Sequence, residues 1–310
     1  MKTKYSILVP AYNEQEVLKI FYDALTKNMD TLKEDYEIVF VNDGSKDNTY
    51  LILKELAQKD KRVKVVNFSR NFGQQAAELA ALRYAVGDAV IIMDCDLQDP
   101  PEVALQMIEK WKEGYEVVHG KRKKRKGETV FKKLTAHVYY RFLRKITGMD
   151  IPTDTGEFKL YDRKVVEAIL ALPEHNRYLR GLATWVGFRQ TSISFDRPNR
   201  SAGVTKWTVK KMIKLAEDGI IANSAYPLTL SIKCGLTLSV SAIIAFITFI
   251  VLAIVGINFG GLVAWLFPTV VLLAGIILIM QGFTNLYIGR VYDEVKGRPN
   301  YIVSETINIK

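Results

Sequence analysis

The chain has 310 residues, with 43 lysines and arginines against 33 aspartates and glutamates, and a formal net charge of +10 at pH 7. This length holds one large domain or two smaller ones with ample core, and the charged and apolar fractions are ordinary for a globular protein. The two cysteines, Cys95 and Cys234, lie far apart in sequence. Their spacing fits no metal-binding cysteine pattern, and we expect both to be reduced.

The first 120 residues alternate between short apolar runs and helical patterns. Pro100 and Pro101 suit the first turn of a further helix. Continuous apolar strands separated by helices predict an α/β domain whose mainly parallel sheet is covered on both faces. The expected strands are 6–10, 37–44, 63–69, 89–94 and 115–122, and the expected helices are 14–29, 47–58 with Asp47 as N-cap, and 74–86.

Acidic residues gather where two of these strands end, in NDGS at 42–45 and in DCDLQDPPE at 94–102. In such sheets ligands bind beyond the carboxyl ends of the strands. In a turn, Asp94 and Asp96 can converge on one hard cation. Mg²⁺ and Mn²⁺ prefer oxygen ligands, and Mg²⁺ often uses one or two carboxylates plus substrate phosphates. The alternatives are an acidic loop without a metal, or acids at a helix N-terminus, which is our interpretation of Asp99 and Glu102.

Six consecutive basic residues follow the fifth strand, in GKRKKRKG at 120–127. Such a run is typically a solvated loop, and a nucleic-acid patch is the alternative. From 131 to 146, apolar residues recur at helical spacing among lysines and arginines. This pattern predicts an amphipathic helix lying on an anionic membrane surface, with a helix packed on the sheet domain as the alternative.

No aspartate, glutamate, lysine or arginine occurs between Cys234 and Gly289. Two spans of about 20 residues fit this stretch, at 236–257 and 262–283, with a buried soluble hairpin as the alternative. Basic residues flank both ends, which predicts a multi-pass protein of the inner (cytoplasmic) membrane with both termini in the cytoplasm. The N-terminus has no signal peptide pattern. The expected domains are 1–226 for catalysis, 227–289 for the hairpin and 290–310 for a cytoplasmic tail.

Six motifs occur in an order typical of one family: SILVPAYNE, VNDGSKDNT, SRNFGQQAA, DCDLQDPPE, DTGEFKLYDR and GRVYDEVKGRPNYIV. Together with the hairpin, they resemble the family 2 inverting glycosyltransferases of the polyprenyl-phosphate sugar transferase group. Dolichol-phosphate mannose synthase and the bacterial undecaprenyl-phosphate glucosyltransferases are members. The resemblance covers essentially the whole chain and implies a GT-A nucleotide-sugar domain.

The resemblance also implies a donor site and a metal site. Asp43 matches the acid that reads the nucleobase, and Asp94 and Asp96 match the pair that holds a divalent cation on the donor diphosphate. Gln98 matches a further metal contact. The other residues expected at the donor are Pro10, Tyr12, Glu14 and Arg200.

For the acceptor, Arg122 matches an arginine near the lipid phosphate, and Lys132 is a looser match to a second basic residue. Asp154 and Glu157 match an active-site segment, so that Asp96, Asp154 and Glu157 form the expected catalytic set. An ionised phosphate monoester needs little help from a general base. We therefore interpret Asp154 as an orienting group, with a base role as the alternative. Further candidate cations are Arg177, Arg180, Arg197 and Lys206.

The implied reaction is metal-dependent, inverting transfer of one sugar from UDP-glucose to undecaprenyl phosphate at the cytoplasmic membrane face, for cell-envelope glycosylation. UDP-GlcNAc and GDP-mannose stay open as donors, as do the choice of Mg²⁺ or Mn²⁺ and assembly into a homo-oligomer. A processive polysaccharide synthase is disfavoured because RYLRGLATW at 177–185 lacks the Q-x-x-R-W motif. A membrane-anchored binder of nucleotide sugars or nucleic acid is disfavoured by the intact DCD and NDGS, and we expect no nucleic-acid partner.

Overall fold

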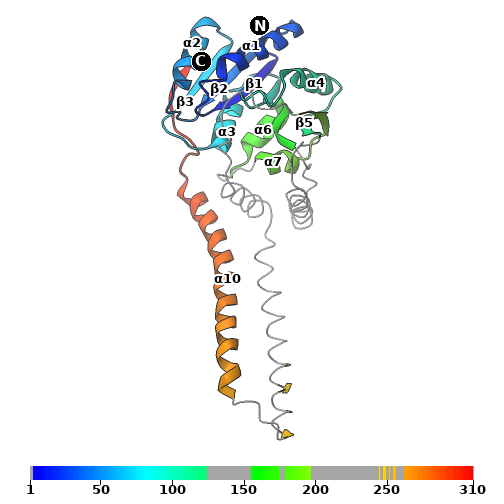
Figure 1. Cartoon of the computed structure of the whole chain (residues 1–310). Coiled ribbons are helices and arrows are strands. Elements are labelled where there is room, and N and C mark those ends of the chain that lie inside the picture. The colour runs from blue at the N-terminus through cyan, green and yellow to red at the C-terminus, as the bar shows by residue number, and fades with distance from the viewer. Residues whose placement is uncertain are drawn as a thin grey trace. The chain divides into compact units, whose positions relative to one another are not determined.

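The structure, a computed structural model, describes residues 3–123, 155–174, 179–196 and 262–309, with 244, 247, 248, 251, 254 and 255. The chain forms two compact units. The first contains Met1–Leu215 and Pro299–Lys310, and the second contains Ala216–Arg298. Both chain ends, marked N and C in Figure 1, therefore belong to the first unit. The domain limits expected from the sequence stay predictions.

The elements of the first unit alternate between strands and helices over its first 122 residues. In chain order the first unit contains β1 (Tyr5–Ala11), α1 (Leu18–Met29), a 3-10 turn η1 (Asp30–Leu32), β2 (Tyr36–Asn42), α2 (Thr49–Lys59), β3 (Val63–Phe68), α3 (Gln74–Tyr84), β4 (Ala89–Ile92), α4 (Pro101–Lys112), β5 (Val117–Arg122), β6 (Thr155–Asp162), α6 (Arg163–Ala171), α7 (Leu179–Trp185), β7 (Gln190–Phe195) and β8 (Val303–Ile307). The second unit contributes α10 (Leu262–Lys296).

Within the described residues, the strands form one mixed sheet in the order β7-β5-β6-β4-β1-β2-β3-β8. β1 pairs in parallel with β2 and β4, β2 pairs in parallel with β3, and β5 pairs in parallel with β7. The expected α/β domain with a mainly parallel sheet is thus confirmed. The strands β6, β7 and β8 were not predicted, and of these β6 and β8 pair antiparallel with their neighbours.

The expected elements match closely, with small shifts at their ends. α1 begins at Leu18 rather than near residue 14, because the chain first makes a loop over the sheet edge. α2 begins at Thr49, and its N-cap position is Asn48. Asp47 nevertheless accepts a hydrogen bond from the Thr49 N–H at 3.0 Å, so it satisfies one of the free amide groups at this helix start.

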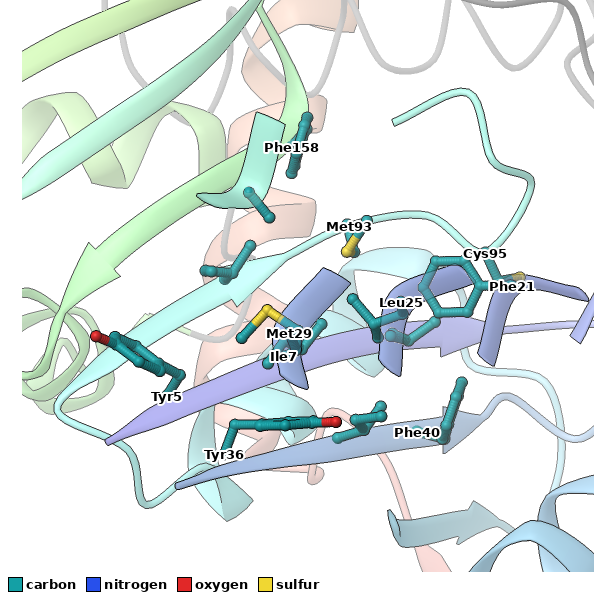
Figure 2. Close-up of a cluster of buried hydrophobic side chains, with 14 of the residues drawn as sticks. Tyr5, Ile7, Phe21, Leu25, Met29, Tyr36, Phe40, Met93, Cys95 and Phe158 are labelled. Atoms are coloured by element: carbon teal, nitrogen blue, oxygen red, sulfur yellow. The ribbon is translucent and has the colours of Figure 1, made fainter. Parts of the chain in front are cut away.

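Helices cover both faces of the sheet and enclose two hydrophobic cores. On one face, α1, α2 and α4 pack over β1 and β2, and Phe21, Leu25 and Met29 of α1 point toward Ile7 and Phe40 (Figure 2). On the other face, α3, α6 and α7 bury a second cluster rich in valine, alanine and leucine. Burial on both faces explains why β2 carries a continuous buried run rather than an alternating one.

The membrane location expected from the sequence is corrected by the structure, and the expected hairpin is not confirmed. Among the residues that the structure describes, no helix has both the length and the apolar character needed to cross a bilayer. The predicted location, a multi-pass protein of the inner membrane, is therefore wrong on this finding. α10 runs from Leu262 to Lys296 and so continues past the charge-free stretch into charged residues. The first expected span and the amphipathic helix at 131–146 lie largely or wholly outside the described residues.

Candidate active site

The four parallel strands β3, β2, β1 and β4 end at one edge of the sheet, where their connecting loops meet. β6 runs antiparallel to β4, so its first residues reach the same edge. β5 is antiparallel to β6 and therefore also ends there. The loops after Ala11, Asn42, Phe68 and Ile92 are thus brought together with the end of β5 and the start of β6.

Asp43 lies at the centre of the edge formed by β1, β2 and β3. It is 4% exposed. Its carboxylate accepts hydrogen bonds from the Asn71 side chain at 2.9 Å, from the Phe72 N–H at 2.7 Å and from the Gly73 N–H at 3.0 Å. Burial raises the pKa of Asp43, while the two backbone N–H groups and the Arg70 charge act in the opposite direction. A carboxylate has about four acceptor positions, so one more donor can be accommodated.

The loop after β1 is fastened to the loop after β2. The Asn13 N–H donates to Ser45 Oγ at 3.0 Å, and Asn13 Oδ1 accepts from the Lys46 N–H at 2.8 Å. Asn13 has a φ of 53°, in the left-handed region that asparagine tolerates better than most residues. The Glu14 N–H donates to Thr49 Oγ1 at 2.8 Å. These bonds fix the segment that carries three of the expected donor residues, which are all half-buried: Pro10, Tyr12 and Glu14.

The acidic loop after β4 turns sharply at Leu97, whose φ is 58°. Cys95 is 3% exposed and belongs to the core under α1 (Figure 2), whereas its neighbours Asp94 and Asp96 are half-buried. Asp96 accepts a hydrogen bond from the Gln98 N–H at 3.1 Å. The turn therefore holds the two aspartates and Gln98 at this edge of the sheet.

The structure does not place Asp99 at the start of a helix, as the sequence suggested. It is 1% exposed, and its Oδ2 accepts the Asp94 N–H at 3.3 Å. The N-cap of α4 is Pro100, without a side-chain cap. Glu102 fits the interpretation better, because it lies in the first turn of α4 and contacts Asn28 at 3.2 Å. Asp99 is thus the buried member of the acidic cluster that includes Asp94 and Asp96. The sequence did not indicate this role of Asp99.

Several negative charges act on Asp94. Burial is the largest cause that raises its pKa, followed by the carboxylates of Asp99, Asp96 and Glu157. The Arg122 guanidinium acts in the opposite direction. These groups come from three separate segments, the loop after β4, the end of β5 and the start of β6. A cluster of carboxylates favours the binding of a cation.

Arg122 and Glu157 come from the end of β5 and the start of β6. In the β4–β6 pairing, Ile92 faces Lys159, so Asp94 and Glu157 each lie two residues beyond that pair on the same side. Gly156 leaves room for the guanidinium of Arg122, because a β-carbon at 156 would lie 2.7 Å from Arg122 Nη2. The structure therefore brings Asp94, Asp96, Glu157 and Arg122 together.

The acidic cluster fits a divalent cation shared with a substrate. In the described part of the chain, no three His, Cys, Asp or Glu side chains are arranged to hold a metal ion alone. Mg²⁺ commonly takes only one or two protein carboxylates and completes its shell with phosphate oxygens and water. Asp94, Asp96 and the Gln98 carbonyl oxygen have this chemistry, and the mutual repulsion at Asp94 is what a cation would relieve.

Some expected site residues lie outside the described residues, namely Asp154, Lys132 and Arg200, with Arg177, Arg197 and Lys206 among the further cations. For Arg180, only the backbone in α7 is described. Sequence reasoning missed the residues 69–73 that surround Asp43, and Gln74, whose side-chain amide contacts Asp94 Oδ1 at 3.4 Å. SRNFGQQAA carries all of them, but nothing in their composition indicates which strand end they contact.

Comparisons with known proteins show what the whole chain is similar to. The sequence profile described as Glycosyl transferase family 2 matches residues 6–170. The chain is 49% identical, over 99% of its length and 95% of the relative's, to "Uncharacterized glycosyltransferase YkcC" of Bacillus subtilis (strain 168). It is 39% identical, over 98% of both chains, to "SfII prophage-derived bactoprenol glucosyl transferase" of Shigella flexneri. Among solved structures, mannosyl-3-phosphoglycerate synthase from Rubrobacter xylanophilus matches with a TM-score of 0.48 and 16% identity, over 70% of this chain and 71% of that one.

Proposed function

Because the chain belongs to glycosyl transferase family 2 and is a glycosyltransferase with a GT-A-like α/β fold, we propose that it transfers one sugar from a nucleoside-diphosphate sugar to a polyprenyl phosphate. The observation that carries the proposal is the single sheet edge that unites Asp43, the acidic loop and Arg122. The name of the Shigella flexneri relative, bactoprenol glucosyl transferase, supports a polyprenyl phosphate acceptor and glucose as the first sugar to test.

At the donor end, we assign Asp43 to the nucleobase. Three of about four acceptor positions on its carboxylate hold the loop at 69–73, so the remaining one suits a ring N–H of a base such as uracil. The end of β1 and the loop after it, which carry Pro10, Tyr12 and Glu14, form the adjacent wall of the proposed donor site. Arg200 is proposed as a further donor contact.

At the diphosphate, Asp94, Asp96 and Gln98 would hold Mg²⁺ or Mn²⁺. When bound, such a cation neutralises the charge that develops on the leaving diphosphate as the bond to the anomeric carbon breaks. The residues of the chain supply the positions: the Leu97 turn sets the spacing of the two aspartates, and buried Asp99 fixes the backbone at Asp94.

At the acceptor, Arg122 presents a planar guanidinium that can hold a phosphate with two parallel hydrogen bonds. Lys132 is proposed as a second cation for the same phosphate. The second ionisation of a phosphate monoester lies near neutrality, so its oxygen attacks without a strong base. Asp154 and Glu157 are therefore assigned to orientation of the reacting groups, and a base role for Asp154 is the alternative.

We propose UDP-glucose as the donor, with UDP-GlcNAc and GDP-mannose as competitors for the same site. The test uses the purified full chain with Mg²⁺ or Mn²⁺, each of these nucleotide sugars, and undecaprenyl phosphate in detergent. We expect a lipid-linked monosaccharide from one donor, detected by mass spectrometry. Transfer of several sugars in succession would favour a processive synthase instead.

The matched variants are Asp96→Ala and Glu102→Ala, two acids of the same segment. Asp96→Ala should abolish turnover while thermal unfolding stays close to that of the wild type. Glu102→Ala should keep turnover, because Glu102 lies in the first turn of α4 and its carboxylate accepts a hydrogen bond from the Asn28 side chain on the surface. Full activity of Asp96→Ala would contradict the metal assignment.

A further inference from the structure

The last residues of the chain form a strand of the catalytic unit, although residues 216–298 separate them from it in sequence. β8 pairs antiparallel with β3, and the register shifts between Asn67 and Phe68. The Ser69 N–H donates to the Ile302 carbonyl oxygen at 3.0 Å, and Ser304 Oγ donates to the Asn67 carbonyl oxygen at 3.0 Å. The motif GRVYDEVKGRPNYIV, to which the proposed function gives no role, ends at this contact.

Aromatic rings extend this contact toward the nucleotide end of the site. Tyr301 stacks on Phe68, with ring centroids 4.9 Å apart and planes at 13°. Phe68 is 2% exposed and makes an edge-on contact with Phe72 at 5.7 Å. The guanidinium carbon of Arg70 lies 4.0 Å from the centre of the Phe72 ring. The three rings thus form a continuous row from the C-terminal segment into the loop at 69–73.

The opposite side of the same loop is bonded to Asp43. The Asn71 side chain and the Phe72 and Gly73 N–H groups all donate to the Asp43 carboxylate. The backbone of Arg70 and Asn71 also lies directly against Gly44, where a β-carbon would come within 2.4 Å. The loop at 69–73 is therefore held between Asp43 on one side and the Tyr301–Phe68 stack on the other.

We propose that Tyr301 is a positioning residue for nucleotide binding. Through Phe68 and Phe72 it holds the loop at 69–73 in the position in which Asp43 presents its remaining acceptor position to the nucleobase. This inference rests on the proposed function, which assigns Asp43 to the base. The C-terminal segment is then a part of the donor site, whereas Arg122 on β5, at the acceptor site, is separated from β8 by the strands β3, β2, β1, β4 and β6.

The experiment measures binding of UDP and of GDP, each with Mn²⁺, to the purified full chain by calorimetry. An aromatic contact contributes a free energy that corresponds to roughly a tenfold change in affinity. We therefore expect Tyr301→Ala to raise the Kd of the preferred nucleotide about tenfold. The KM for undecaprenyl phosphate should stay within about twofold. Tyr301→Phe keeps the stacked ring, so this variant should bind the nucleotide with a Kd close to that of the wild type.

Glu305→Ala is the matched control on the same strand. Glu305 is exposed, and its carboxylate contacts the Tyr50 hydroxyl and Lys54 rather than the loop at 69–73. This variant should bind both nucleotides as the wild type does. Tyr301→Leu keeps apolar volume at this position without a flat ring, and it supplies the same comparison if the alanine variant fails to fold.

Wild-type nucleotide affinity in Tyr301→Ala, an equal loss in Glu305→Ala, or failure of Tyr301→Phe to restore binding would overturn the inference. Asp43→Asn separates it from the proposed function. If Asp43→Asn leaves the Kd of both nucleotides unchanged, the proposed donor site fails. If Asp43→Asn weakens binding and Tyr301→Ala does not, only the role of Tyr301 fails.

Discussion

The guanidinium of Arg122 lies over Gly156, so close that a β-carbon at position 156 would stand 2.7 Å from Nη2. The absence of a side chain at Gly156 therefore makes room for the Arg122 guanidinium. It does not serve a left-handed backbone conformation. The obstructed atom is the end of a flexible side chain, so the strands β5 and β6 need not move when that space is filled.

Gly156→Ala should displace the Arg122 guanidinium and leave the sheet intact. We expect the KM for undecaprenyl phosphate to rise about tenfold or more, since a phosphate held by two parallel hydrogen bonds is sensitive to the position of the fork. The melting temperature should change by only a few degrees. Steady-state kinetics with each substrate varied in turn measures this effect.

The control for this prediction is Gly289→Ala, because a β-carbon there meets nothing within 4 Å. It should leave both KM values unchanged. A Gly156→Ala enzyme with wild-type kinetics would show that the position of Arg122 does not matter to the acceptor.

Gly44→Ala should damage the donor site through the backbone. Gly44 has a φ of 62°, and a β-carbon would meet the backbone carbonyl carbon of Arg70 at 2.4 Å. The loop at 69–73 must shift away from Asp43, so we expect at least tenfold weaker UDP binding and a loss of about 2 kcal/mol in stability. Calorimetry and urea unfolding measure the two effects.

Gly187→Ala separates strain from obstruction. Gly187 has a similar φ of 74°, but its nearest contact would be at 3.9 Å. Gly187→Ala should lower the free energy of unfolding by about 1 kcal/mol, the strain of the left-handed conformation. UDP binding should be unchanged. Equal nucleotide affinities in the two variants would argue against contact between Gly44 and the loop as the cause.

The sequence predicted the first half of the sheet well, because each of β1 to β4 is a short apolar run followed by a helix. The placement of Asp43, Asp94 and Asp96 at one edge followed from parallel pairing. Asp99 was misread, because an acid two residues before Pro101 has the same local pattern whether it starts a helix or is buried under Asp94. Only the tertiary structure distinguishes these.

β8 could not be predicted, because the pairing of Val65 with Ile307 joins residues 242 positions apart in sequence (307 minus 65). No local pattern specifies such a partner, and the preceding charge-free stretch suggested a tail beyond a membrane hairpin. That hairpin is predicted from two long apolar, uncharged segments, whereas none of the described helices meets the requirement for a span. The role of 69–73 was missed because two of its three hydrogen bonds to the Asp43 carboxylate come from backbone N–H groups, which residue types do not reveal.

Asn13 offers a graded test of the link between the first two loops. Its side chain accepts the Lys46 N–H at 2.8 Å, and its backbone adopts a φ of 53°. Asn13→Gly keeps the backbone conformation and loses the hydrogen bond, about 1 kcal/mol. Asn13→Ala loses the bond and adds strain, about 2 kcal/mol in total. Urea unfolding should rank the wild type above Asn13→Gly and Asn13→Ala last; an alanine variant as stable as the glycine variant would contradict the strain argument.

His119 should make stability depend on pH. Its side chain is 2% exposed, and Nε2 contacts Gln190 Oε1 at 2.8 Å. Burial, and then the charge of Lys159 on the neighbouring strand, lower its pKa to about 4, while the Gln190 bond and Glu157 act in the opposite direction. The unfolded chain binds its proton near pH 6.5. Between pH 6.5 and 4 the unfolded state therefore holds more protons, and the free energy of unfolding falls as the pH falls.

From pH 7 to pH 5 this histidine should cost the folded state about 2 kcal/mol. His119→Gln can still meet Gln190 and has no proton to gain, so its stability should fall less over that interval. The ring of His119 can also be followed by NMR, because the chain has only three histidines. One signal, absent in His119→Gln, should titrate well below pH 5. If all three histidines titrate between pH 6 and 7, the buried, neutral imidazole beside Lys159 is refuted, and with it this pH dependence.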